Sequence, residues 1–113
     1  YIFLSGRVKD FIKRGGEMIS PEEVERVLES YTSIDEAAII GIPDMDWGER
    51  VRAIVTLKQN HEFNELDIIE FCRTKLASFK KPESVVVVGE LPRNSLGKVL
   101  KNTLRDKYSY PIE

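Results

Sequence analysis

The feature that most constrains the fold is a pair of apolar runs in the middle of the chain. Residues 36–42 are almost continuously apolar, which predicts a buried strand that ends at a Pro-Asp pair. Residues 51–58 alternate between apolar and mostly polar side chains, which predicts a second strand with one face toward the core. A turn around Trp47 and Gly48 joins the two runs, so we expect an antiparallel pair.

Three helices are predicted around this strand pair. The first has Ser20 as its N-cap, Pro21 in the first helical position and Glu23 completing a capping box. The second follows Asn64, which can also cap a helix, and the third is short and C-terminal. The apolar stripes expected to face the core are Val24, Val27, Leu28 and Tyr31 in the first helix, Leu66, Ile69, Cys72 and Leu76 in the second, and Leu100, Leu104 and Tyr108 in the third.

Short β-prone segments complete the predicted fold. Residues 1–4 and 11–13 indicate two strands separated by a charged turn, and residues 85–88 indicate another strand. The resulting order is strand, strand, helix, strand, strand, helix, strand, helix. It predicts an α+β domain with a small, mostly antiparallel sheet of about three core strands plus an N-terminal hairpin, packed with about three helices.

The composition excludes several classes of function. The 113 residues, 42% of them hydrophobic, suit one domain with one core. A balance of 17 basic and 19 acidic residues argues against a nucleic-acid partner or a membrane-surface role. With only Cys72 and His61, we expect no disulfide, no zinc site and no Cys/His nucleophile. The lone thiol and the absence of a long apolar run predict a cytoplasmic protein without a membrane span.

One loop is a candidate for chemistry. Residues 92–98, PRNSLGK, form a turn-rich run that presents Lys98. A phosphate-cradling loop of the form G-x-x-x-x-G-K-[ST] would need glycine at Pro92 and serine or threonine at Val99, so this loop is of another kind. Lys98 could instead act as a single mobile cation toward a carboxylate or phosphate. The alternative is an ordinary solvated lysine.

Two segments together resemble a known family. Residues 6–25, GRVKDFIKRGGEMISPEEVE, and residues 92–98 resemble two core motifs of adenylate-forming enzymes, the family of acyl-CoA synthetases, luciferases and nonribosomal peptide adenylation domains. GIPD at 41–44 followed by WGE at 47–49 looks like a third landmark. The resemblance spans essentially the whole chain.

The resemblance implies a fragment of a larger enzyme, as a start at Tyr1 without methionine also suggests. Residues 1–5 would be the end of the hinge-proximal strand leading from an N-terminal domain, and residues 6–113 the mobile C-terminal domain. In this family a carboxylic acid reacts with ATP to give an acyl-adenylate, and the acyl group then passes to coenzyme A. We therefore expect an acid–thiol ligase of fatty acid metabolism, with ATP and Mg²⁺ bound mainly by the N-terminal domain and this domain inactive alone.

The resemblance also implies roles for single residues. Lys98 matches the catalytic adenylation lysine, Arg7 an arginine near the nucleotide ribose, and Lys9 the hinge position. The alternative for Lys9 is an ordinary turn residue. Simple turn chemistry is the alternative for Gly15 and Gly16, and core packing is the alternative for Trp47 and Phe79. The residues that resemble contacts of coenzyme A are Gly15, Gly16 and Glu17 at the pantetheine tunnel and Trp47, Phe79, Lys80 and Lys81 at the nucleotide.

Two departures from the family pattern limit the transfer. Lys101 stands where the family commonly has arginine, which keeps the charge and loses the bidentate fork. Met18 is uncharged where some short-chain relatives have arginine, which argues against an acetyl-CoA synthetase. Two other functions stay open: an adenylation domain that loads a free-standing carrier protein, and a binding module that retained the fold without the chemistry.

Overall fold

The structure is a computed structural model, and it describes residues 11–60, 62–76 and 80–110. The first strand expected from the sequence, residues 1–4, lies outside these ranges. The described elements are β1 (Ile12–Arg14), β2 (Glu17–Ile19), α2 (Pro21–Glu29), β3 (Ile34–Asp44), β4 (Gly48–Leu57), α3 (Glu65–Lys75), β5 (Ser84–Val87) and α4 (Lys101–Tyr108).

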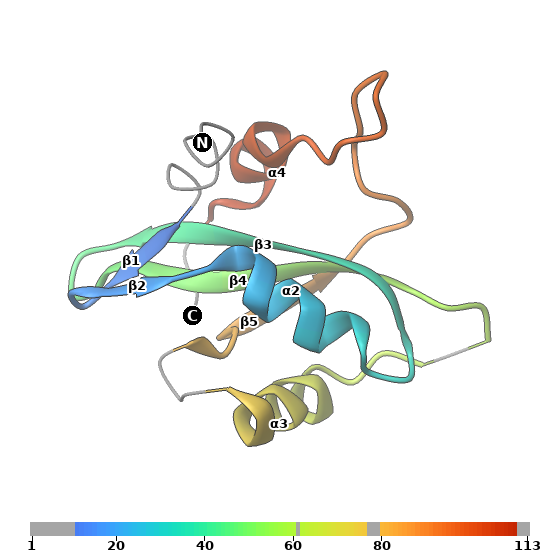
Figure 1. The fold of residues 1–113 in the computed structure, drawn as a ribbon, viewed down its shortest axis with the longest axis horizontal. Helices are drawn as coiled ribbons and strands as arrows, with labels where there is room; N and C mark the ends of the chain where they lie inside the picture. The colour runs from blue at the N-terminus through green and yellow to red at the C-terminus, as the bar shows by residue number, and fades with distance from the viewer. Residues whose placement is uncertain (1–10, 61, 77–79, 111–113) are drawn as a thin grey trace.

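One five-stranded sheet organises the domain (Figure 1). The strand order is β2-β1-β4-β3, and β5 also pairs with β4. β5 runs parallel to β4, whereas the other pairs are antiparallel. The small, mostly antiparallel α+β fold predicted from the sequence is therefore confirmed. The described hairpin, however, is β1–β2 around Gly15 and Gly16, so the sequence reading missed β2.

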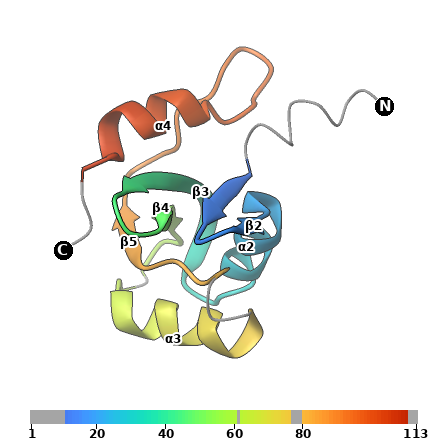
Figure 2. The same ribbon diagram turned by 90° about the vertical axis from the view of Figure 1, so that its left-hand side faces the viewer.

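Both faces of the sheet are buried (Figure 2). α2 and α3 pack on one face, where Ala37, Ile39 and alternate residues of β4 face Val24, Leu28, Ile68 and Cys72. α4 covers the other face through Leu104. The prediction that β4 turns only one face to the core is thus wrong: Arg52, Ile54 and Thr56 are also buried, and α4 covers Ile54 through Leu104 and Arg52 through Tyr108.

A buried arginine fastens the end of α4 to the sheet. Arg52 is 2% exposed, and one terminal nitrogen of its guanidinium donates to the carbonyl oxygens of Tyr108 and Tyr110, each at 2.7 Å. Its Nε donates to Ser84 Oγ at 3.1 Å, and the guanidinium carbon lies 4.2 Å from the centre of the Tyr110 ring. Burial lowers the pKa of Arg52. These bonds satisfy carbonyl groups at the helix end that have no partner within the helix.

The helix starts confirm part of the sequence reading. Ser20 and Pro21 open α2 as predicted, but within the described residues the Ser20 side chain makes no capping hydrogen bond. Glu23 pairs instead with Lys80 at 3.0 Å, so the predicted capping box does not form. At the start of α3, Asn64 Oδ1 accepts from Asp67 N at 3.0 Å, as expected of a cap.

The apolar stripe of α3 is rotated from the predicted one. Leu66 was expected in the core and is 76% exposed, whereas Ile68 is fully buried beside Cys72. Leu66 lies about 120° around the helix from Cys72, outside the face that meets the sheet. None of the helices in the described ranges is long and apolar enough to cross a membrane.

Candidate functional site

Lys98 lies on a loop whose shape depends on one side chain. The loop is closed at its base by a bridge between Arg93 and Val99. Inside it, Asn94 Oδ1 accepts from the backbone N–H groups of Leu96 at 2.9 Å and Lys98 at 3.0 Å. The backbone N–H of Asn94 in turn donates to the Lys98 carbonyl oxygen at 3.0 Å. Hydrogen bonds on both sides of Lys98 therefore define the backbone that carries the ammonium.

Arg93 ties this loop to the sheet. Its guanidinium forms an ion pair with Glu36 of β3 and donates to the carbonyl oxygen of Gly97 at 2.7 Å. Gly97 adopts φ +83°, a conformation that glycine reaches without strain. The side chain of Lys98 is exposed, and within the described residues its ammonium has no ionic or hydrogen-bonding partner. The loop therefore presents one available cation.

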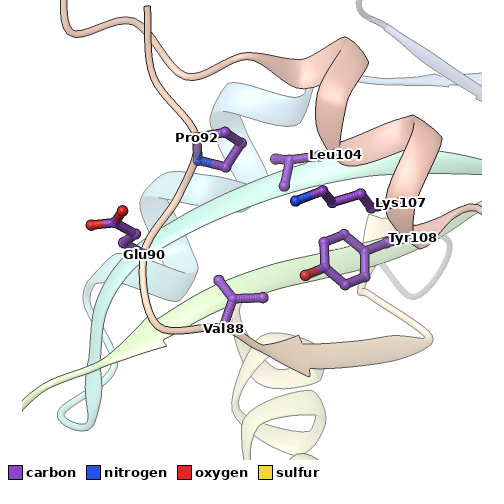
Figure 3. Close-up of a pocket in the computed structure, with 6 residues that line it drawn as sticks. All are labelled: Val88, Glu90, Pro92, Leu104, Lys107 and Tyr108. Atoms are coloured by element: carbon purple, nitrogen blue, oxygen red, sulfur yellow. The ribbon is translucent and has the colours of Figure 1, made fainter.

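Two hollows flank α4. The first, about 310 Å³, lies beside the loop and gathers the cationic side chains of Lys98, Lys101 and Arg105. The second, about 200 Å³, lies between α4 and residues 88–92 (Figure 3). There the Lys107 ammonium points into the hollow and the Glu90 carboxylate points away from it. The hollow beside the loop therefore has cationic side chains in its lining, of which the Lys101 ammonium is paired with Glu25.

The predicted coenzyme A positions Gly15 and Trp47 meet at the other end of the domain. The Gly15 amide donates to the Trp47 carbonyl oxygen at 2.7 Å, and a Cβ added at Gly15 would lie 2.9 Å from Trp47 Cε3. Gly15 and Gly16 have φ values of +59° and +88°. Arg14 covers the indole, with its guanidinium carbon 4.3 Å from the ring centre. Trp47 is nevertheless 46% exposed, so part of this residue stays open to solvent beside a turn without side chains.

The remaining predicted site residues lie on other segments or outside the described residues. Glu17 is exposed on β2 beside the turn, whereas Lys80 and Lys81 are partly buried after α3. The Lys80 ammonium pairs with Glu23 at 3.0 Å. The other three predicted residues, Arg7, Lys9 and Phe79, lie outside the described residues.

Sequence reasoning missed the residues that support both ends. Arg14 pairs with Glu83 at 2.7 Å, and Glu83 also pairs with Arg50. This cluster joins β1 and β4 to the segment before β5, behind Trp47. Local spacing gives no signal for it, because Arg14 and Glu83 are far apart in the chain.

In Figure 1, where the longest axis of the domain is horizontal, the β1–β2 turn lies at the left end and the loop before α4 lies at the top right. The domain measures 38 Å along that axis. The two surfaces therefore lie well apart on the domain. Among the described residues, no three His, Cys, Asp or Glu side chains gather to hold a metal ion, so no Mg²⁺ ligand set is assigned to them.

A match to a family model shows which protein family the chain belongs to. The model of the AMP-binding enzyme C-terminal domain matches residues 23–98. The chain belongs to this family. The resemblance drawn from its two motifs is thereby confirmed, and Lys98 is the last residue of the match.

Similar proteins are acyl-CoA ligases. A long-chain-fatty-acid–CoA ligase of Mycobacterium tuberculosis is 44% identical over 112 residues, covering 99% of this chain and 22% of the relative. A mitochondrial malonate–CoA ligase of Bos taurus is also 44% identical, over 98% of this chain and 19% of the relative. This chain therefore spans roughly a fifth of the length of these relatives.

Solved structures agree with the sequence comparison. A fatty acyl CoA synthetase of Mycobacterium tuberculosis matches with a TM-score of 0.85 and 46% identity, over 91% of this chain and 20% of the other. Apo MatB from Rhodopseudomonas palustris matches with a TM-score of 0.86 and 38% identity, over 89% and 20%. The fold described above is thus the fold of the corresponding part of these proteins.

Proposed function

We propose that this domain is the mobile C-terminal part of an AMP-forming acyl-CoA synthetase. The full-length enzyme would convert a carboxylic acid and ATP to an acyl-adenylate and pyrophosphate, then transfer the acyl group to the thiol of coenzyme A with release of AMP. The observation that carries the proposal is the pairing, on one domain, of an available cation at one end with a side-chain-free turn and an open indole at the other. The names of the relatives, which are CoA ligases, support the same reaction class.

Lys98 is proposed as the catalytic residue of the first half-reaction. When a carboxylate attacks the α-phosphate of ATP, two anions approach each other and charge accumulates between them. A cation held there in a water-poor site stabilises the transition state more than the separated reactants. An exposed ammonium without a partner in the described residues is available for this purpose. Arg7 is proposed to contact the ribose, in line with its position in the motif.

The Gly15 end is proposed to act in the second half-reaction. Backbone without side chains leaves room for the narrow pantetheine arm beside Gly15, Gly16 and Glu17. The open face of Trp47 can stack on an adenine ring, and the ammonium groups of Lys80 and Lys81 can meet phosphates. Phe79 is proposed to join this nucleotide site.

The proposal also implies which partners the domain has. Its own N-terminal domain would hold the acid, ATP and Mg²⁺, and rotation about Lys9 would exchange the two ends over that shared centre. Bound there, Mg²⁺ would offset charge on the phosphates. The enzyme is proposed to work in the cytoplasm, consistent with a single buried thiol, Cys72.

Lys98→Ala in the full-length enzyme tests the proposal. We expect acyl-adenylate formation, measured by pyrophosphate release, to fall by about 100- to 1,000-fold, because one electrostatic contact to the transition state is lost. Thioester formation from preformed acyl-adenylate should change little. Lys107→Ala, which removes an exposed lysine of α4 outside the loop, is the matched control and should leave both steps intact. Equal losses in the two half-reactions of the Lys98 variant would contradict the proposal.

A further inference from the structure

Two glutamates of α2 meet the outer edge of β3. β3 is an edge strand of the described sheet, so alternate N–H groups point away from β4. Glu25 Oε2 accepts from Ile39 N at 2.8 Å, and Glu29 Oε2 accepts from Ala37 N at 3.2 Å. The two glutamates, one helical turn apart, thus make the same kind of bond to the same strand.

Only Glu25 also reaches α4. Lys101, the first residue of α4, places its ammonium 2.5 Å from Glu25 Oε2 and 2.9 Å from the carbonyl oxygen of Ile39. Both side chains of the ion pair are only 18% exposed. One compact ammonium thereby satisfies two acceptors without the fork of an arginine.

Lys101 is poorly placed for the stability of its own helix. It occupies the first turn of α4, which contains no acidic residue, and a cation there is opposed by the helix dipole. Glu25 supplies the missing negative charge from another helix. The arrangement therefore anchors the start of α4 to α2 and β3 rather than stabilising α4 alone.

We propose that Glu25 and Lys101 are positioning residues that hold the loop so that Lys98 reaches the reacting centre. Lys101 follows Lys98 by three residues and anchors one stem of the loop, while Arg93 and its partner Glu36 anchor the other. Both anchors attach to β3, so the loop is fixed to the sheet at two points. Loss of one anchor shifts the base of a long side chain, and a displacement of about 1 Å at a reacting group costs about 100-fold in rate.

This inference rests on the proposed role of Lys98, and its test uses the full-length enzyme. Glu25→Gln keeps the size of the side chain and an oxygen that can accept from Ile39 N, but removes the charge that pairs with Lys101. Glu29→Gln removes a charge one turn away that has only the strand contact. We expect Glu25→Gln to lower the rate of acyl-adenylate formation by about 10- to 100-fold. The thioester step should be unchanged, and Glu29→Gln should match the unaltered enzyme.

A second set of variants separates positioning from general damage to the fold. Lys101→Met should reproduce the loss seen with Glu25→Gln, and Lys101→Arg should restore most of the rate. In a Lys98→Ala background, Glu25→Gln should cause no additional loss, because its effect acts through Lys98. If Glu25→Gln does not fold, Lys101→Met in the two backgrounds carries the same test.

The outcomes distinguish this inference from the function on which it rests. If Lys98→Ala lowers acyl-adenylate formation while Glu25→Gln and Lys101→Met do not, the positioning role is overturned and the proposed function stands. Losses that multiply with that of Lys98→Ala, or that affect both half-reactions equally, also overturn the positioning role. If Lys98→Ala has no effect, both proposals fail.

Discussion

The two ends of the domain present opposite chemistry by opposite means. The Lys98 loop offers one charged, flexible side chain, and its placement depends on side chains from distant parts of the chain, such as Glu36 and Glu25. The Gly15 end offers the half-exposed indole of Trp47, which requires the absence of a side chain at Gly15. One end is therefore vulnerable to loss of its anchors, and the other to the addition of a single methyl group.

Gly15→Ala should produce the largest loss of stability, and this loss should arise in the β1–β2 hairpin. Its φ of +59° is strained for alanine, and the new Cβ would press on Trp47. We expect the free energy of unfolding to fall by about 1–3 kcal/mol, measured by chemical denaturation of this chain.

Gly16→Ala is the matched control for this prediction. Its φ of +88° is also strained, but no atom lies within 4 Å of the added Cβ. It should therefore lower the free energy of unfolding less than Gly15→Ala does. In a Trp47→Ala background, the difference between the two glycine variants should be smaller. Equal losses at the two glycines would show that backbone strain alone, and not contact with the indole, limits this turn.

Asn94→Ala should weaken the other end with a smaller effect. The variant loses both hydrogen bonds from the loop amides of Leu96 and Lys98 to Asn94 Oδ1. Two such bonds contribute about 1–2 kcal/mol, so acyl-adenylate formation by the full-length enzyme should slow by about tenfold. Asn102→Ala, which removes the acceptor of an Arg105 hydrogen bond within α4, should have no such effect. A comparable slowing of the thioester step by Asn94→Ala would argue against a role confined to this loop.

The smallest predicted effect concerns the reactivity and titration of the Cys72 thiol. It is fully buried, and burial raises the pKa of its thiol to about 11. The thiol should resist alkylation at pH 8, because it is both enclosed and protonated. Since the folded-state pKa exceeds the ordinary value of 9.0, its contribution to stability is complete below pH 9 and is lost as pH rises toward 11.

The rate of alkylation of Cys72 should also respond differently to changes in the hairpin and in the Lys98 loop. Ile12 and Ile19 of the hairpin belong to the same core cluster as Cys72, whereas Leu91 and Leu104, near the loop, belong to the cluster on the other face. Gly15→Ala should therefore accelerate alkylation of Cys72 more than Asn94→Ala does, as measured by mass spectrometry. The reverse order would indicate that the loop, rather than the hairpin, controls opening of this core.

Local chemistry explains which parts of the fold could be predicted. The β3–β4 pair follows from its apolar runs, and the starts of α2 and α3 follow from Ser20-Pro21 and Asn64. The second buried face of β4 could not be predicted, because it depends on where α4 packs. Arg52 in particular looks like a solvent-facing residue in an alternating strand until its partners, more than fifty residues away, are known.

The residues of the candidate site also fall into those that local motifs predict and those that depend on long-range packing. Lys98, Gly15 and Trp47 could be selected from motifs, because glycine-rich turns and a loop lysine are visible in the sequence. Their supports could not, since Glu25 and Lys101 are 76 residues apart and Glu36 and Arg93 are 57 apart. Contacts over such separations are determined by the packing of α2 and α4 against the sheet, which no local pattern specifies.

The groups that cover the outer edge of β3 also affect how this domain can associate with other molecules. An edge strand with free N–H and C=O groups can recruit a strand from another molecule and seed aggregation. Here Glu29 occupies the outward N–H of Ala37, while Glu25 and Lys101 occupy both outward groups of Ile39. The middle of this edge is thereby closed to strand addition, which protects the domain from pairing with a strand of a neighbouring molecule.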